Sequence, residues 1–136
     1  MFHTIVEVAN VLAATAAAFA LGTVWYGWLS KQWLRATGIP AGADGRPVKG
    51  GSPIVFVIGF FLELLVAGMM RHVFAMAGIN GLGLGILAGF GIGLFFITPW
   101  IAMTNLYAMR PIKLTLIDGG YAVISTTVMG FILALF

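Results

Sequence analysis

Long stretches without a charged side chain dominate this chain of 136 residues. No Asp, Glu, Lys or Arg occurs in the 23 residues between Glu7 and Lys31, or anywhere from Val73 to Met109. A soluble domain carries about 25% charged residues, whereas this chain has 8% and a hydrophobic content of 61%. A chain this apolar cannot cover a water-facing surface, and the hydrocarbon core of a bilayer suits it better. The sequence therefore predicts an integral membrane protein.

The charges and turn residues divide the chain into four apolar spans. Each span exceeds the roughly 20 residues that an α-helix needs to cross the hydrocarbon core. Pro53 suits the first turn of the second span, and residues 78–81 supply a turn inside the long uncharged stretch. Pro99 is expected to kink the third span. We predict an all-α, single-domain bundle of four transmembrane helices at about 4–29, 53–77, 82–107 and 112–135.

The basic residues predict the orientation of this bundle. The loop 30–52 and the turn near residue 110 lie on the same side and carry six of the seven basic residues, namely Lys31, Arg35, Arg46, Lys49, Arg110 and Lys113. Loops rich in Lys and Arg stay in the cytoplasm. We therefore expect a cytoplasmic loop 30–52 and both termini on the outer, periplasmic side of a bacterial inner membrane. Residues 31–35 are expected to form a short helix at the membrane interface.

Aromatic and basic side chains gather at the predicted cytoplasmic boundary. Trp and Tyr favour the headgroup level, and long basic side chains reach it by snorkelling. We predict interfacial anchors at Trp25, Tyr26, Trp33, Arg110 and Lys113. On the opposite side, Arg71 is expected to contact lipid phosphate or water. His3 and His72 form no metal-ligand pattern, so we expect no metal and no cofactor.

Four glycines recur every four residues in the third span: Gly81, Gly85, Gly89 and Gly93. This spacing places them along one helix face, where missing side chains let another backbone approach closely. Smaller counterparts occur in the first span (Ala14, Ala18 and Gly22) and in the fourth (Ala122, Thr126 and Gly130). The glycine face therefore predicts helix packing, either within one bundle or against a second copy, with a pore lining as a third possibility.

Glu63 lies ten residues into the second span, about 15 Å deep at 1.5 Å per residue and so close to the middle of the bilayer. Ionisable residues at this depth are functional candidates by default. Arg71 lies about 12 Å further along the axis, so we expect no ion pair with it inside the helix. Three interpretations stay open: a protonated carboxyl bonded to a neighbouring helix, a proton- or cation-coupled site, and an ion pair with a partner subunit.

Asp118 shares one face of the fourth span with Thr115, Ala122 and Ser125. Asn105 and Thr104 of the third span lie at a comparable depth and could bond to Asp118. Such a group is either an interhelical hydrogen-bond cluster or a site for a small cation or a lipid headgroup. Glu63, Asp118 and Asn105 are therefore the candidate intramembrane polar residues.

Several local patterns resemble those of a known family. They are Gly22-x-x-Trp25-Tyr26, Lys31-x-Trp33 with Gly38, and Arg110-Pro111-Ile112-Lys113-Leu114 continuing through Leu116-Ile117 to Gly120-Tyr121. With these patterns the chain resembles, over essentially its whole length, the bacterial integral membrane proteins catalogued as domain of unknown function 1761. The resemblance implies four helices in matching places, and it assigns no activity.

Enzyme and nucleic-acid signatures are missing from the sequence. It holds no nucleophile elbow, H-E-x-x-H or P-loop, and no basic cluster that suits nucleic acid. We expect a small non-enzymatic inner-membrane protein that contacts membrane lipids. It either forms a homo-oligomer or serves as an accessory subunit of a larger membrane complex. The alternative is an oligomeric small-solute or ion transporter that uses Glu63.

Overall fold

A computed structural model describes residues 1–47 and 52–136 of the chain. The elements in order are α1 (Phe2–Trp28), α2 (Ser30–Thr37), α3 (Pro53–Ala77), α4 (Leu82–Ile92), the π-helical turn η1 (Gly93–Ile97), α5 (Thr98–Tyr107) and α6 (Ile112–Leu135). Because α4, η1 and α5 follow one another directly, four helices are long and apolar enough to cross a membrane. The prediction of an all-α chain with four such helices is confirmed. Lys49, counted above among the basic loop residues, lies outside the described residues.

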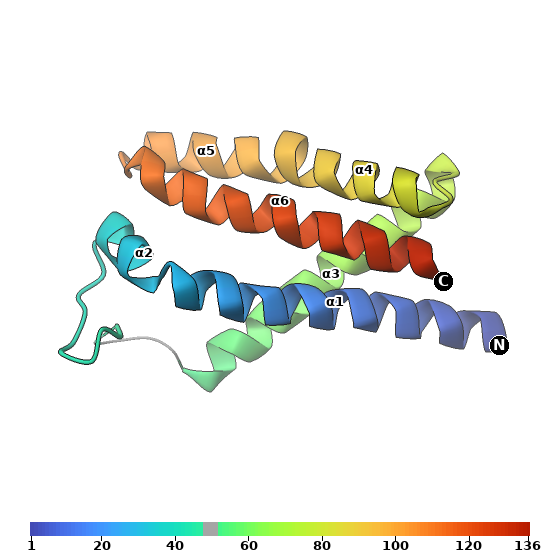
Figure 1. The fold of residues 1–136 in the computed structure, drawn as a ribbon, viewed down its shortest axis with the longest axis horizontal. Helices are drawn as coiled ribbons and strands as arrows, with labels where there is room; N and C mark the ends of the chain where they lie inside the picture. Colours follow the sequence, from blue (N-terminus) through green and yellow to red (C-terminus); the bar gives the residue numbers. More distant parts are fainter. Residues whose placement is uncertain (48–51) are drawn as a thin grey trace.

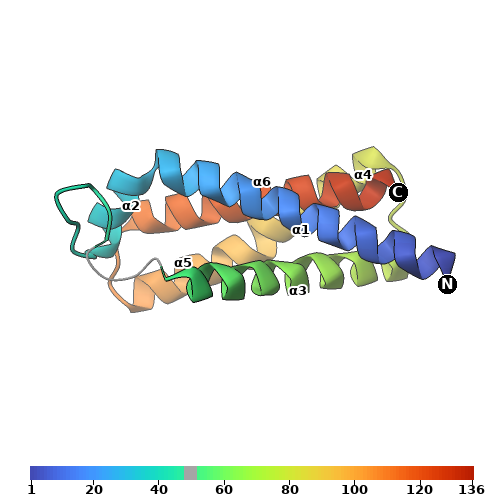
Figure 2. The same cartoon turned by 90° about the horizontal axis from the view of Figure 1, so that it is seen from below.

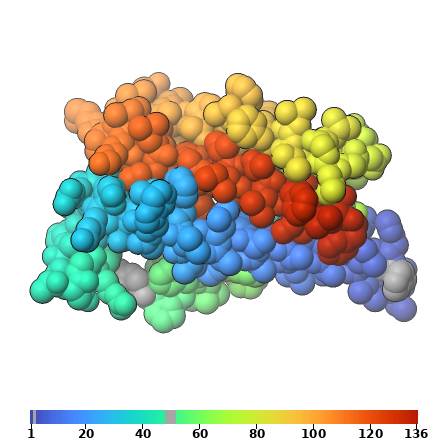
Figure 3. Space-filling model, viewed as in Figure 1, coloured from blue at the N-terminus to red at the C-terminus, as the bar shows by residue number. Residues whose placement is uncertain are grey.

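The last helix, α6, is the centre of the bundle. It lies between α1 on one side and the continuous α4–η1–α5 rod on the other, while α3 crosses α1 obliquely (Figure 1). In the space-filling view α1 and α6 are in contact along this face of the molecule (Figure 3). In the most apolar 18-residue stretch of α6, 44% of the residues are buried, whereas in the corresponding stretch of α3 only 11% are buried. The other helices are therefore arranged around α6.

Both chain termini lie at one end of the bundle, and α2 lies at the other (Figure 1). We call these the termini end and the α2 end. Between α1, α3 and α6, from the middle of the bundle towards the termini end, lies an apolar core cluster. Its buried members are Ala14, Ala18, Ala67, Met70, Phe74, Met129 and Leu133. This cluster holds the second half of α3 against the rest of the chain.

The first half of α3 has few neighbours within the chain. Five consecutive side chains, Ile54 to Ile58, are each between 48% and 59% exposed. Since consecutive helix residues point in all directions, this stretch is open on every side. Figure 1 shows the reason, because the oblique crossing carries this half of α3 away from α4, α5 and α6. Seen from below, α3 and α1 lie apart at the α2 end and approach each other towards the termini end (Figure 2).

Three of the four predicted packing glycines place the third span against α6. A Cβ atom added at Gly85 would lie 2.6 Å from the carbonyl oxygen of Gly130, and one at Gly93 would lie 2.6 Å from Cα of Val123. Gly89 faces the backbone of Thr126 in the same contact. Only residues without a side chain fit so close an approach. The glycine face is therefore covered by α6 within one chain.

Gly81 is not part of this face, and its assignment to helix packing is wrong. It precedes the first residue of α4 with a φ of +88°, and a Cβ there would meet no atom within 4 Å. Glycine adopts positive φ without steric cost. Gly81 is therefore a turn residue that happens to lie on the four-residue spacing.

The third span is irregular directly before Pro99. Proline cannot donate a backbone hydrogen bond, and its ring collides with the carbonyl four residues earlier, here that of Phe95. Phe95 lies inside the π-helical turn η1, where the backbone is wider than in an α-helix. The third span thus departs from α-helical geometry just before Pro99, while the kink itself stays a prediction.

Candidate functional site: a polar column between α1, α3 and α6

Four charged side chains of the membrane-spanning helices lie along one line of contact. Glu7, Glu63, Arg71 and Asp118 all meet partners at the junction of α1, α3 and α6. They form three levels, marked on α1 by Asn10, Ala18 and Tyr26. These α1 residues are eight apart, so neighbouring levels are separated by about 12 Å along the helix axis. We call this arrangement the polar column.

The level at the termini end is built around Arg71. Its guanidinium donates hydrogen bonds to Oδ1 of Asn10 at 3.2 Å and to the carbonyl oxygens of Leu133 at 3.0 Å and Phe136 at 3.3 Å. Glu7 lies 3.6 Å from the same guanidinium. Arg71 therefore joins α1 and α3 to the last turn of α6. Its side chain is 26% exposed, and its contact with lipid phosphate or water stays a prediction.

The middle level is the pair of Glu63 and Tyr121. The Tyr121 hydroxyl contacts the carbonyl oxygen of Ala18 at 2.7 Å and also Oε1 of Glu63. Gly22 makes room for it, because a Cβ there would lie 2.7 Å from the hydroxyl oxygen. A hydroxyl carries one hydrogen. Both contacts are hydrogen bonds at once only if Glu63 is protonated and donates to the Tyr121 oxygen.

The middle level also contains the second carboxyl oxygen of Glu63, Oε2. Oε2 is buried and has no hydrogen-bond partner among the residues that the structure describes. An ionised carboxylate without partners is costly in an apolar setting. Of the interpretations offered by the sequence, a protonated carboxyl bonded to a neighbouring helix is the one that this geometry fits.

The level at the α2 end joins Asp118 to Tyr26. The Tyr26 hydroxyl donates to Oδ1 of Asp118 at 2.8 Å. The Tyr26 ring makes edge contacts with Trp33 of α2, at 6.1 Å between centroids, and with Tyr121, at 5.3 Å. Two carboxyl–tyrosine pairs thus lie next to each other, one at the α2 end and one in the middle of the bundle.

Asn105 of α5 is not part of this column. Its side-chain amide donates to Oγ1 of Thr115 at 3.0 Å. About two turns earlier in the same span, the Thr98 hydroxyl donates to the carbonyl of Gly119 at 3.2 Å. These bonds join α5 to α6. Asn105 therefore bonds to Thr115 of α6, three residues before Asp118, and not to Asp118 itself.

The predicted anchors divide into two groups. Arg110 and Lys113 are exposed at the α2 end, whereas Trp25 and Tyr26 turn inwards. The Trp25 indole donates to the carbonyl of Ile117 at 2.9 Å, and its ring lies against Gly120. Trp28, by contrast, is 74% exposed. Trp25 and Tyr26 therefore hold α1 against α6 and are not free interfacial side chains.

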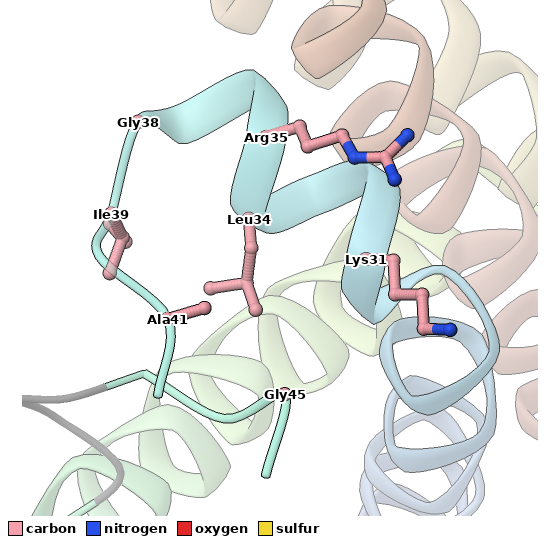
Figure 4. Close-up of a pocket in the computed structure, with 7 residues that line it drawn as sticks. All are labelled: Lys31, Leu34, Arg35, Gly38, Ile39, Ala41 and Gly45. Atoms are coloured by element: carbon pink, nitrogen blue, oxygen red, sulfur yellow. The ribbon is translucent and has the colours of Figure 1, made fainter. Parts of the chain in front are cut away.

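The surface of α2 and the following loop enclose a shallow hollow of about 360 Å³. Leu34, Ile39 and Ala41 line one part of it, while Lys31 and Arg35 extend from the other side of α2 (Figure 4). A ligand site needs polar groups that converge, and these two cations do not converge on the apolar part. Across residues 1–47 and 52–136, no three His, Asp or Glu side chains are close enough to hold a metal ion.

Sequence reasoning missed Tyr121 as a candidate site residue and gave Tyr26 only the role of an interfacial anchor, although one signal was present. Tyr121 lies in the middle of an apolar span, and a buried tyrosine hydroxyl needs a partner. It also lies three residues after Asp118 and four before Ser125, hence on their face of the helix. Counting tyrosine hydroxyls together with the carboxyl and amide groups at mid-span depth would have added Tyr121 to the candidate site.

Comparison with known families supplies a further finding. The model of a family described as protein of unknown function (DUF1761) matches residues 9–134. None of the curated proteins and none of the solved structures matches the chain.

Proposed function

This chain belongs to the DUF1761 family of proteins of unknown function, and on that premise we propose that it is a proton-coupled membrane transporter. Glu63 is the group that binds and releases the coupling proton, and no enzymatic step is involved. The observation that carries this proposal is the Glu63–Tyr121 pair, with a buried and unpartnered carboxyl oxygen near the middle of a membrane span.

The packing of the helices does not require a polar side chain at the position of Glu63. The single hydrogen of Tyr121 already has an acceptor in the Ala18 carbonyl. A leucine in place of Glu63 would therefore leave no donor unpaired, and it would remove the cost of placing a carboxyl in lipid. A costly group that no structural partner needs is best explained by the proton it can exchange.

The position of Glu63 on α3 couples protonation to movement. It lies between the exposed first half of the helix and the second half, which the apolar core cluster holds. A neutral carboxyl can stay at this junction, whereas a charged one needs water or a cation. Loss of the proton is therefore expected to favour displacement of the first half of α3 from Tyr121. This gives the two states that alternating access requires.

Replacing Glu63 by glutamine tests the proposal. Proteoliposomes with an internal pH dye and an imposed membrane potential report proton flux directly. Glu63→Gln keeps the shape and removes the titrating group, so flux is expected to fall about 100-fold or more, as when an acid–base group is lost. Asp44→Asn is the matched control, since Asp44 is an exposed carboxylate outside the helices. Absence of flux in the wild type, or equal flux in Glu63→Gln, contradicts proton coupling.

The orientation and location follow as further proposals. At the α2 end (Figure 1), α2 carries Lys31 and Arg35, the following loop carries Arg46, the turn between α5 and α6 carries Arg110, and the first turn of α6 carries Lys113. Arg71 lies at the termini end, where it bonds to Phe136. Because cytoplasmic loops are enriched in basic residues, we place the α2 end in the cytoplasm and both termini outside. The location that suits this arrangement is a bacterial inner membrane.

Assembly is a second candidate function, and the open first half of α3 favours it. With the glycine face already covered by α6, this stretch is the surface that a second copy would use. Gly59 lies within it, and a Cβ there would meet no atom of its own chain. Native mass spectrometry of gently extracted protein is expected to show a homo-oligomer of defined copy number. Gly59→Trp should dissociate it, while Gly83→Trp, on an open part of α4, should not. Monomers alone contradict assembly through α3, and foreign subunits would indicate an accessory chain.

A further inference from the structure

We infer that in the state described here Glu63 exchanges its proton with the α2 end of the bundle, and that Tyr26 and Asp118 form the proton-holding pair at that entrance. Exchange with the termini end belongs to the second state that transport requires. The inference rests on the proposed function in one respect, namely that Glu63 is a proton site. It adds the route and the side of access, and it gives Tyr26 and Asp118 a role beyond joining α1 to α6.

The route consists of adjacent polar groups from three helices. Asp118 accepts the hydrogen of Tyr26 at 2.8 Å. The Tyr26 ring touches that of Tyr121 at 5.3 Å between centroids, and the Tyr121 hydroxyl contacts Glu63. A tyrosine hydroxyl is both donor and acceptor, so each member can pass a hydrogen onwards. The two hydroxyls are brought into reach by a rotation of Tyr121 or by one bridging water.

In the other direction an apolar layer separates Glu63 from the termini end. Ala14 of α1, Ala67 and Met70 of α3, and Met129 of α6 fill the space before Arg71 is reached, and all four are buried. Thr15 and Thr126 lie at this depth, but their hydroxyls are bonded to carbonyls of their own helices. Packed apolar side chains leave no room for a chain of waters. This layer therefore closes the column towards the termini.

The charged and titratable groups near Glu63 agree with a single entrance. From α1 the nearest is Tyr26, and from α6 they are Tyr121 and Asp118. The next one on α3 is Arg71, whose guanidinium already contacts Asn10, Leu133, Phe136 and Glu7. Towards the termini end the one further hydroxyl beside Tyr121 is that of Ser125, which is 4% exposed, and the buried side chains of the apolar layer follow it. Among these described groups, the carboxyl and tyrosine side chains near Glu63 thus lie on its α2 side.

One-sided pH changes test the side of access. Oriented proteoliposomes are treated with the membrane-permeant reagent dicyclohexylcarbodiimide, which reacts with a protonated carboxyl, and the adduct on Glu63 is measured by intact and peptide mass spectrometry. Labelling falls as pH rises, because the reactive form is protonated. We expect labelling to follow the pH on the α2 side and to respond far less to the pH on the termini side. Equal responses to both sides would overturn the inference.

Two substitutions test the entrance pair. Tyr26→Phe and Asp118→Asn are expected to slow the protonation of Glu63 after a pH step on the α2 side about tenfold or more, measured by time-resolved infrared absorption of its carboxyl group, as for loss of a positioned proton carrier. The final level of labelling should stay at the wild-type value, whereas a merely structural role would change that level and not the rate. Thr98→Val is the control, because Thr98 of α5 bonds to the carbonyl of Gly119 and is not part of the polar column.

The outcomes separate the two proposals. Unchanged protonation rates in both variants overturn the relay, while proton flux lost in Glu63→Gln would still stand. Conversely, one-sided labelling together with slower protonation in Tyr26→Phe would support the relay even if the wild type moves no protons across the membrane. That last result would contradict transport and leave Glu63 as a proton-binding site that responds to one compartment.

Discussion

Replacing Gly89 by leucine is expected to lower the free energy of unfolding by about 3 kcal/mol, the upper part of the range for over-packed cores. A Cβ at this position would point at the carbonyl of Thr126 and lie 3.2 Å from Cα of Gly130. Both neighbours are backbone atoms, which cannot rotate aside as a side chain would. The two helices must therefore separate, and the contacts of Gly85 and Gly93 on either side are lost with them.

Gly91→Leu is the matched control for this experiment. Gly91 lies two residues further along the same helix, and a Cβ there meets no atom within 4 Å. Both substitutions change helix propensity equally, so the difference between them measures the contact with α6. Unfolding followed by circular dichroism in mixed micelles, with increasing denaturing detergent, supplies the free energies. If the two variants were equally stable, the close contact between α4 and α6 would be contradicted.

Replacing Arg71 by methionine is expected to cost about 2 kcal/mol, the value of a hydrogen bond to a charged group. The methionine keeps most of the side-chain volume and removes the donors. Asn10, which is 0% exposed, then loses its partner at Oδ1, and two carbonyls at the end of α6 lose theirs. The termini end of α6 should open first, which hydrogen exchange of its last turn would show.

Two further variants identify what Arg71 supplies. Arg71→Lys keeps the charge but offers a single ammonium in place of a planar fork, so it should recover only part of the stability. His72→Met changes the exposed neighbouring residue and should leave stability within about 0.5 kcal/mol, as for most surface substitutions. Full stability in Arg71→Lys would mean that charge alone matters, and the bonds to the α6 carbonyls would then be irrelevant.

The spans of the fold were predictable because charges and turn residues mark their ends. Pro53 begins α3, and the uncharged stretch divides at the turn before Leu82. These signals are local, since the cost of a charge in lipid and the φ of a glycine depend on one residue and its surroundings. The same local reasoning located Glu63 at mid-span without any knowledge of its partner.

The partners across helices were not predictable in the same way. Which face of one helix meets which face of another depends on the rotation of both, and a sequence pattern fixes neither. By its depth Asn105 could have bonded to Asp118, yet it bonds to Thr115. The bonds of Arg71 were not predicted because its acceptors, mainly backbone carbonyls of α6, leave no trace in the sequence.

The π-helical turn η1 keeps the two halves of the third span in phase with α6. Gly85, Gly89 and Gly93 face α6 at steps of four residues, whereas the next contact, Thr98, comes five residues after Gly93. Each residue advances an α-helix by about 100°, so the extra step offsets a rotation that would otherwise turn α5 sideways. The third span thus consists of two α-helices, α4 and α5, joined by a π-helical turn that contains one extra residue. A relative of this chain lacking that residue would keep four hydrophobic spans of nearly the same length, yet it would direct Thr98 and Asn105 towards lipid.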